Sequence, residues 1–226
     1  MKHIDRSAVI LWAKRLLIYF CGLFCIATGI AFSAKSGLGV SPVGSPANVL
    51  YQIGLDRGWP ENLSNLGNWT FAVYTVYILA QIVMLRRKFR PLQLLQLLVS
   101  FLFGYLVNLA GAILTPIPAP EVYWLRMAYL LASIPLVALG VLLYLSAKLL
   151  PTPGEGTALA VSETFHTAVS TGKTVLDCSA VTISVVLSLV YFRGLVGVRE
   201  GTIISALLTG PCMRLFETLI PRLKTK

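Results

Sequence analysis

The chain has 226 residues, of which 56% are hydrophobic and only 12% charged, and its formal net charge is +10. Soluble domains carry about 25% charged residues, so a chain this apolar cannot cover a water-facing surface. The positive charge does not indicate nucleic-acid binding, because the basic residues cluster at the ends of apolar runs, as at Arg86–Lys88. Composition therefore excludes a soluble domain and predicts an integral membrane protein whose first partner is the lipid bilayer.

Apolar runs of about 20 residues, the length that crosses a bilayer as an α-helix, recur along the whole chain. They predict an all-α fold, a polytopic transmembrane helical bundle with six spans at about 8–33, 67–85, 91–114, 122–148, 174–192 and 200–218. Two stretches are helix-capable but too short to span, at about 43–54 and 155–169. We expect residues 55–66 to form an interfacial loop and residues 171–173 to lead into the fifth span.

Two interruptions of the helical pattern follow the first and fourth spans. The first break (residues 33–42) and the second break (residues 146–157) both begin with Ser-Ala-Lys and then lose helical character through Gly and Pro. They lie half a chain length apart, which indicates an internal duplication. The sequence thus predicts two three-span repeats, 1–115 and 121–226, joined by a Pro-rich linker at 116–120. Because three crossings is an odd number, the second repeat enters from the opposite face, and the repeats are inverted.

The distribution of Lys and Arg predicts the orientation of the chain. With the N-terminus inside and six crossings, most of the 19 basic residues fall on the inner side. Cytoplasmic loops of membrane proteins carry this excess of positive charge. We therefore expect both termini in the cytoplasm.

The paired breaks are the predicted binding region for a small-molecule substrate. Irregular backbone at membrane depth survives only inside protein or beside a water-filled cavity, and paired breaks mark the site in transporters built from repeats. The candidate substrate-binding residues are Gly39, Ser41, Ser45 and Asn48 around the first break and Gly154, Glu155, Gly156 and Thr157 in the second. The sequence leaves open whether the two short helices are re-entrant or lie flat at the membrane interface.

Glu163 and His166 form a second candidate pair. They are i, i+3 neighbours on the second short helix and could handle protons together. The alternative is that both side chains face the cytoplasmic headgroups. Catalytic residues, a metal site and a cofactor are not predicted, because the sequence has two histidines and contains neither His-Glu-x-x-His, Gly-x-Ser-x-Gly nor Cys-x-x-Cys.

Two stretches carry a resemblance to a known family. Residues 29–34 lead into Gly-Leu-Gly-Val-Ser-Pro at 37–42, and Glu-Gly-Thr at 200–202 leads through an apolar run to Gly210-Pro211. These stretches resemble the YczE/YyaS/YitT-type bacterial membrane proteins, over nearly the whole chain. The sequence departs from the family pattern after Pro42, where Val43-Gly44-Ser45 replaces a bulky residue and an acid. The resemblance implies a multi-pass protein of the bacterial cytoplasmic (inner) membrane, with a permease or an accessory role.

The expected function is secondary transport of a small organic solute, without enzymatic activity. The alternative is a non-transporting adaptor that supports a partner enzyme or assembly. The adaptor would expose a small-residue face, such as Gly22 with Gly29, for docking another helix, and the core between its repeats would be dry and apolar. A second copy of the chain is a further candidate partner.

Overall fold

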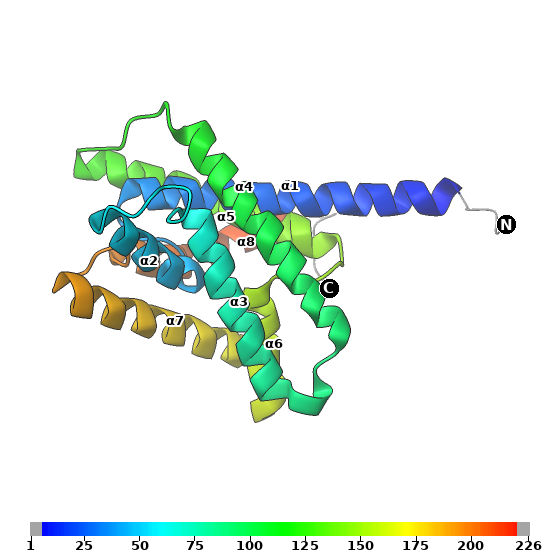
Figure 1. Ribbon diagram of the computed structural model, residues 1–226. Coiled ribbons are helices and arrows are strands. Elements are labelled where there is room, and N and C mark those ends of the chain that lie inside the picture. The colour runs from blue at the N-terminus through cyan, green and yellow to red at the C-terminus, as the bar shows by residue number, and fades with distance from the viewer. Residues whose placement is uncertain (1–5, 221–226) are drawn as a thin grey trace.

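The computed structural model describes residues 6–220, and the regular elements in that range are all helices. The first half contains α1 (Arg6–Ser36), η1 (Pro42–Gly44), α2 (Ser45–Asp56), α3 (Leu66–Leu85), η2 (Arg86–Lys88), η3 (Pro91–Leu94) and α4 (Leu95–Leu114). The second half contains α5 (Tyr123–Ser146), α6 (Pro153–Phe165), α7 (Val169–Phe192) and α8 (Glu200–Leu219). The predicted all-helical class is therefore confirmed (Figure 1).

Five stretches of helix are long and apolar enough to cross a membrane: Val9–Ser36, Leu66–Lys88, Pro91–Leu114, Tyr123–Ser146 and Val169–Phe192. Their outward faces are apolar as well, with Val76 and Val190 among the exposed side chains, as lipid-facing helices require. The residues predicted as the sixth span form the helix α8, which has 20 residues. It is not one of the five because it is less apolar, and its second half carries Arg214 and Glu217.

Helices α1 and α5 cross at glycines, so that their backbones touch. A Cβ atom at Gly22 would lie 2.6 Å from the Tyr144 nitrogen, and one at Gly140 would lie 2.6 Å from the Gly22 oxygen. About two turns further along α1, a Cβ at Gly29 would lie 2.6 Å from Val137 Cγ2. Small residues permit this close approach where lipid provides no hydrophobic drive between helices. Gly22 and Gly29 are thus buried between two helices of the same chain. The expectation that they form an exposed docking face in an adaptor is therefore wrong.

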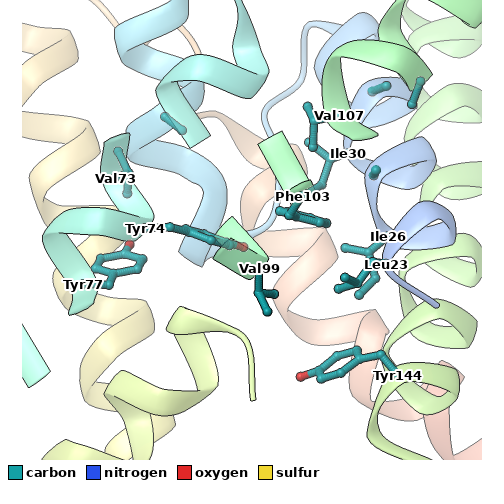
Figure 2. Packing of buried hydrophobic residues seen from close by; sticks show 14 of the residues in the cluster. Leu23, Ile26, Ile30, Val73, Tyr74, Tyr77, Val99, Phe103, Val107 and Tyr144 are labelled. Carbon is teal, nitrogen blue, oxygen red and sulfur yellow. The ribbon is translucent and has the colours of Figure 1, made fainter. Parts of the chain in front are cut away.

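An apolar core lies between α1, α3, α4 and α5. Figure 2 shows Leu23 and Ile26 of α1 facing Phe103 of α4, with Tyr74 of α3 on the other side of that ring. The rings of Tyr74 and Phe103 stack at a centroid distance of 5.6 Å and an interplanar angle of 4°. This core holds the long helices together and forms one wall of the region where the short helices enter.

The two short helices, α2 and α6, pack inside the bundle, and each lies against both α3 and α7. The first turn of α2, from Ser45 to Asn48, is buried, as are most residues in the first half of α6. A helix lying flat on a membrane surface would leave one whole face uncovered. Their burial therefore favours the cavity-lining interpretation over the interfacial one.

Residues 171–173, expected to lead into the fifth span, belong to the first turns of α7, which begins at Val169 and so earlier than predicted. The chain reverses earlier, at His166, which has a left-handed φ of 52° and ends α6. Gly172 is a packing residue. A Cβ atom there would lie 2.3 Å from the Ala158 oxygen, so the glycine lets α7 approach α6 closely.

Candidate functional site

The short helix η1, which leads into α2, meets the first turn of α6 in the interior of the bundle. Val43, the residue after the first break, packs on Gly154 of the second break, where a Cβ atom would lie 2.9 Å from Val43 Cγ1. Tyr77 of α3 joins the two sides: its hydroxyl donates to the Val43 carbonyl at 3.0 Å, and its own carbonyl accepts from the Thr157 hydroxyl at 3.2 Å. We call this contact the break junction. The positive N-terminal ends of two helices converge on it.

Two fully buried glutamines hold the second break. Gln81 of α3 donates through Nε2 to Gln96 Oε1 at 3.0 Å, to the Pro153 carbonyl at 3.2 Å and to the Thr157 hydroxyl at 3.2 Å. Gly156 lies directly against both amides, since a Cβ atom there would come within 2.9 Å of Gln81 Oε1 and of Gln96 Nε2. The sequence-based candidates omitted both glutamines. The signal was available, because each is an amide side chain within a predicted apolar span.

Glu155, in the first turn of α6, places a carboxyl group inside the protein. Its Oε2 atom is inaccessible and has no hydrogen-bond partner. The buried hydroxyl of Tyr144 faces both Glu155 and Thr152 but makes no well-formed hydrogen bond to either. The nearby ammonium of Lys173 is bound to Asp177 at 2.7 Å. Glu155 therefore belongs to no ion pair in the described part of the chain.

Burial raises the pKa of the Glu155 carboxyl, and the Lys173 ammonium acts in the opposite direction. The N-terminus of α6 also favours the ionised form, by about 0.3–1 kcal/mol in ordinary cases. Removing a carboxylate from water costs several kcal/mol, so desolvation outweighs the helix end. Burial thus favours the neutral form of Glu155 more than water does.

The candidates around the first break are held by the second half of the chain. Gly39 has a φ of +103°, and a Cβ atom there would lie 2.5 Å from the Thr202 hydroxyl of α8. Ser45 and Ser184 of α7 share a hydrogen bond of 2.8 Å between their hydroxyls. Asn48 donates to the Gly197 carbonyl at 2.6 Å. Glycine is thus required at position 39 both by its backbone angle and by the packing of α8.

Ser41 faces a different space from the other candidates. It lines a cavity of about 10 Å³ between α1, α5 and α8, together with hydroxyl side chains at Ser33, Ser133, Ser205 and Thr209. That volume is about what one water molecule needs, and the hydroxyls are suitable partners for it.

The eight candidates therefore do not share one open cavity. Gly154, Gly156 and Thr157 lie at the break junction, whereas Glu155 faces the buried tyrosines beside it.

Buried polar atoms without hydrogen-bond partners gather at the two breaks. Within residues 6–220 these atoms are Asn48 Oδ1, Gln81 Oε1, Gln96 Nε2, Tyr144 Oη, Glu155 Oε2 and Thr202 Oγ1. Asn48 and Thr202 pack around the first break, and the other four residues surround the second break. An unsatisfied buried polar group costs about 1–3 kcal/mol, so such a concentration calls for a partner that this conformation does not supply.

Two larger pockets open to the outside of the bundle, away from the junction. One, of about 520 Å³, lies between the end of α1, α2 and the end of α4, and its polar lining is Lys35, Tyr51, Gln52, Glu61, Asn65 and Asn108. The other, of about 540 Å³, is lined by residues 84–88 together with Glu163, Thr164 and His166. In it Glu163 pairs with Lys88 at 3.6 Å, and both side chains are more than half exposed. His166, which follows α6 with a left-handed φ of 52°, lines the same pocket, and the proton-handling role of Glu163 and His166 stays a prediction.

Long apolar helices packed around buried polar breaks define a multi-pass helical membrane protein. The chain belongs to a family of unknown function, DUF6198, whose family model matches residues 13–218. It is also 22% identical over 209 residues to the uncharacterized protein YyaS of Bacillus subtilis (strain 168), covering 92% of this chain and 94% of that protein. The resemblance to YyaS-type proteins drawn from the sequence is thereby confirmed. No solved structure matched the chain.

Proposed function

We propose that the protein is a secondary transporter that carries a small organic solute across the bacterial cytoplasmic membrane by way of the break junction. In this proposal α8 is a sixth span, both termini are cytoplasmic, and the two halves are inverted repeats. The six unpartnered polar atoms around the breaks are the observation that carries the proposal. A transport site needs polar groups that bind a solute or water in one conformation and release it in another.

The pairing of the helices supports the inverted-repeat arrangement. In an inverted repeat, α1, α2, α3 and α4 of the first half correspond to α5, α6, α7 and α8 of the second. The contact between α1 and α4 then matches the contact between α5 and α8. In the same way α2 packs on α7 as α6 packs on α3, and α1 crosses α5, its own counterpart. A two-fold relation between the halves would produce this pattern, and it would bring the two short helices together at their N-terminal ends.

The pocket of about 520 Å³ beside α2 is where we expect a solute to bind first, before the junction opens. With the N-terminus inside, this pocket opens on the outer face, between the end of α1 and the loop before α3. Its lining holds an ammonium at Lys35, a carboxylate at Glu61 and amides at Asn65 and Asn108. Such a lining suits a small polar solute better than a purely apolar one.

A reversible lock across the junction tests the proposal. A Cβ atom at Gly154 would lie 3.9 Å from the Val43 Cβ. Disulfides join Cβ atoms about 3.5–4.5 Å apart, so Val43→Cys with Gly154→Cys should cross-link on oxidation. The pair is made in a background whose four native cysteines are replaced. The purified protein is reconstituted in liposomes and given a panel of radiolabelled anionic, cationic, zwitterionic and neutral solutes.

We expect uptake of at least one solute class by the reduced protein, loss of that uptake on oxidation, and recovery on reduction. The Val43→Cys single variant is the control, since it cannot form the cross-link and should ignore the oxidant. Flat uptake traces for every solute, or undiminished uptake by the fully cross-linked protein, would contradict transport through the junction.

A further inference from the structure

We propose that the carboxyl group of Glu155 is the proton-coupling site of the transport cycle, taking up a proton from water while α6 faces water and holding it while α6 is packed inside the bundle. This inference rests on the proposed transport function and adds the coupling ion to it. This residue is not one of the pair Glu163 and His166 predicted from the sequence: Glu155 lies eight positions before Glu163, at the buried end of the same helix.

The surroundings of Glu155 suit a carboxyl that changes charge. Tyrosine rings approach it from three long helices, Tyr19 of α1, Tyr74 of α3 and Tyr144 of α5. The Tyr19 hydroxyl donates a hydrogen bond to the Leu150 carbonyl at 3.1 Å. The Tyr144 hydroxyl has no hydrogen-bond partner, and only 2% of Tyr144 is exposed. Figure 2 shows the Tyr144 side chain directed away from α5 into the interior. A protonated Glu155 could donate to this hydroxyl, whereas an ionised one could accept from it.

Every helix that packs around Glu155 contributes identified titratable or charged groups. These are Tyr19, Tyr74 and Tyr144, with Lys173 and Asp177 of α7. Lys173 forms an ion pair with Asp177 at 2.7 Å, so its ammonium is shared with another carboxylate, although it still lowers the pKa of Glu155. The carboxylate consequently has no dedicated counter-ion, which is the arrangement in which a buried acid takes up a proton rather than keeping a fixed charge.

The step is a simple proton transfer and it balances. With α6 turned toward water, the carboxylate accepts a proton from hydronium and leaves a water molecule. The neutral acid can then enter the bundle without the cost of burying a charge. When the site opens on the other side of the membrane, the acid returns the proton to water. One proton moves with each solute, without any oxidant or other co-reactant.

Infrared spectroscopy of the reconstituted full-length protein measures the protonation of Glu155 without knowledge of the solute. At neutral pH we expect the carbonyl stretch of a protonated carboxylic acid in the wild-type protein and in Glu163→Gln, which changes only an exposed ion pair. The band should be absent from Glu155→Gln. In Tyr144→Phe, which keeps the ring, the band should remain but shift in frequency because a hydrogen-bond partner is lost. A wild-type spectrum without the band, or a Glu155→Gln spectrum that retains it, would overturn the assignment.

The uptake assay then separates this inference from the function on which it rests. We expect an inwardly directed proton gradient to stimulate solute uptake several-fold in wild-type protein and in Glu163→Gln, and to have no effect on Glu155→Gln. Uptake that ignores the gradient in the wild-type protein overturns the coupling role and leaves the transport function standing. Failure of all solutes to enter overturns the transport function, and the coupling role falls with it.

Discussion

Gly22 and Gly140 occupy positions where any side chain would push two helices apart. The nearest atoms to a Cβ at Gly22 are backbone atoms of α5, the Tyr144 nitrogen and the Gly140 oxygen at 2.7 Å. Backbone atoms cannot move aside as the end of a flexible side chain can. A stability effect at Gly22 therefore reports the contact between α1 and α5 directly.

We expect Gly22→Ala to lower the stability of the protein by about 1–3 kcal/mol, the usual cost of overpacking a close-packed interior. The matched control is Gly111→Ala on α4, where a Cβ atom would meet nothing within 4 Å. Alanine is the better helix former, so the control should gain about 0.5–1 kcal/mol. Thermal unfolding in detergent, followed by tryptophan fluorescence, distinguishes the two. Equal melting temperatures for both variants would show that α1 and α5 do not touch at this glycine.

At the level of residues, the sequence located the breaks better than it located the polar atoms that face them. Gly154, Gly156 and Thr157 were predicted from local pattern and do lie at the break junction. Gln81 and Gln96 were not predicted, because each is a single amide in an apolar run and its partner lies in another helix. Hydrogen bonds between distant segments, such as Gln81 to Pro153, leave no periodic trace in a single sequence.

At the level of elements, hydropathy predicted the positions of the long helices well, since burial in lipid depends on the composition of each segment by itself. It misjudged the start of α7, where the glycine at 172 is needed for packing on α6. The short helices could be identified by length, but their docking against α3 and α7 depends on contacts between distant segments. Helix α8 decides the topology. If it crosses the membrane the chain has six crossings, and if it does not the chain has five, so the C-terminus lies on opposite sides in the two cases.

Reporter fusions test whether α8 crosses the membrane. We expect green fluorescent protein fused after residue 226 to fluoresce and alkaline phosphatase at the same place to be inactive, because six crossings return the C-terminus to the cytoplasm. A phosphatase inserted at Gly58, in the loop after α2, should be active and serves as the outer-face control. An active C-terminal phosphatase would mean that α8 does not span, and the inverted repeat would lose its last helix.

At the scale of the whole molecule, the apolar exterior contacts lipid and the polar breaks form the candidate binding region. The exposed faces of the long helices, with side chains such as Val83 and Leu207, meet lipid, while the polar groups collect inside around α2 and α6. The junction residues Ser45, Gly154 and Thr157 are buried in this conformation. Transport therefore requires that the junction open to water in another conformation, and such an opening can be detected without knowing the solute.

The most direct measurement is the reactivity of a cysteine at Ser45 toward a membrane-impermeant thiol reagent, in a background without the four native cysteines. Ser45 is fully buried beside the junction, and serine to cysteine is a small change. Ala27→Cys, equally buried in the apolar core of α1, is the control. We expect the cysteine at 45 to be modified slowly in membranes and the cysteine at 27 to remain unmodified, while both react after denaturation. If the cysteine at 45 is as protected as the one at 27, water does not reach the junction and the proposed route for the solute is contradicted.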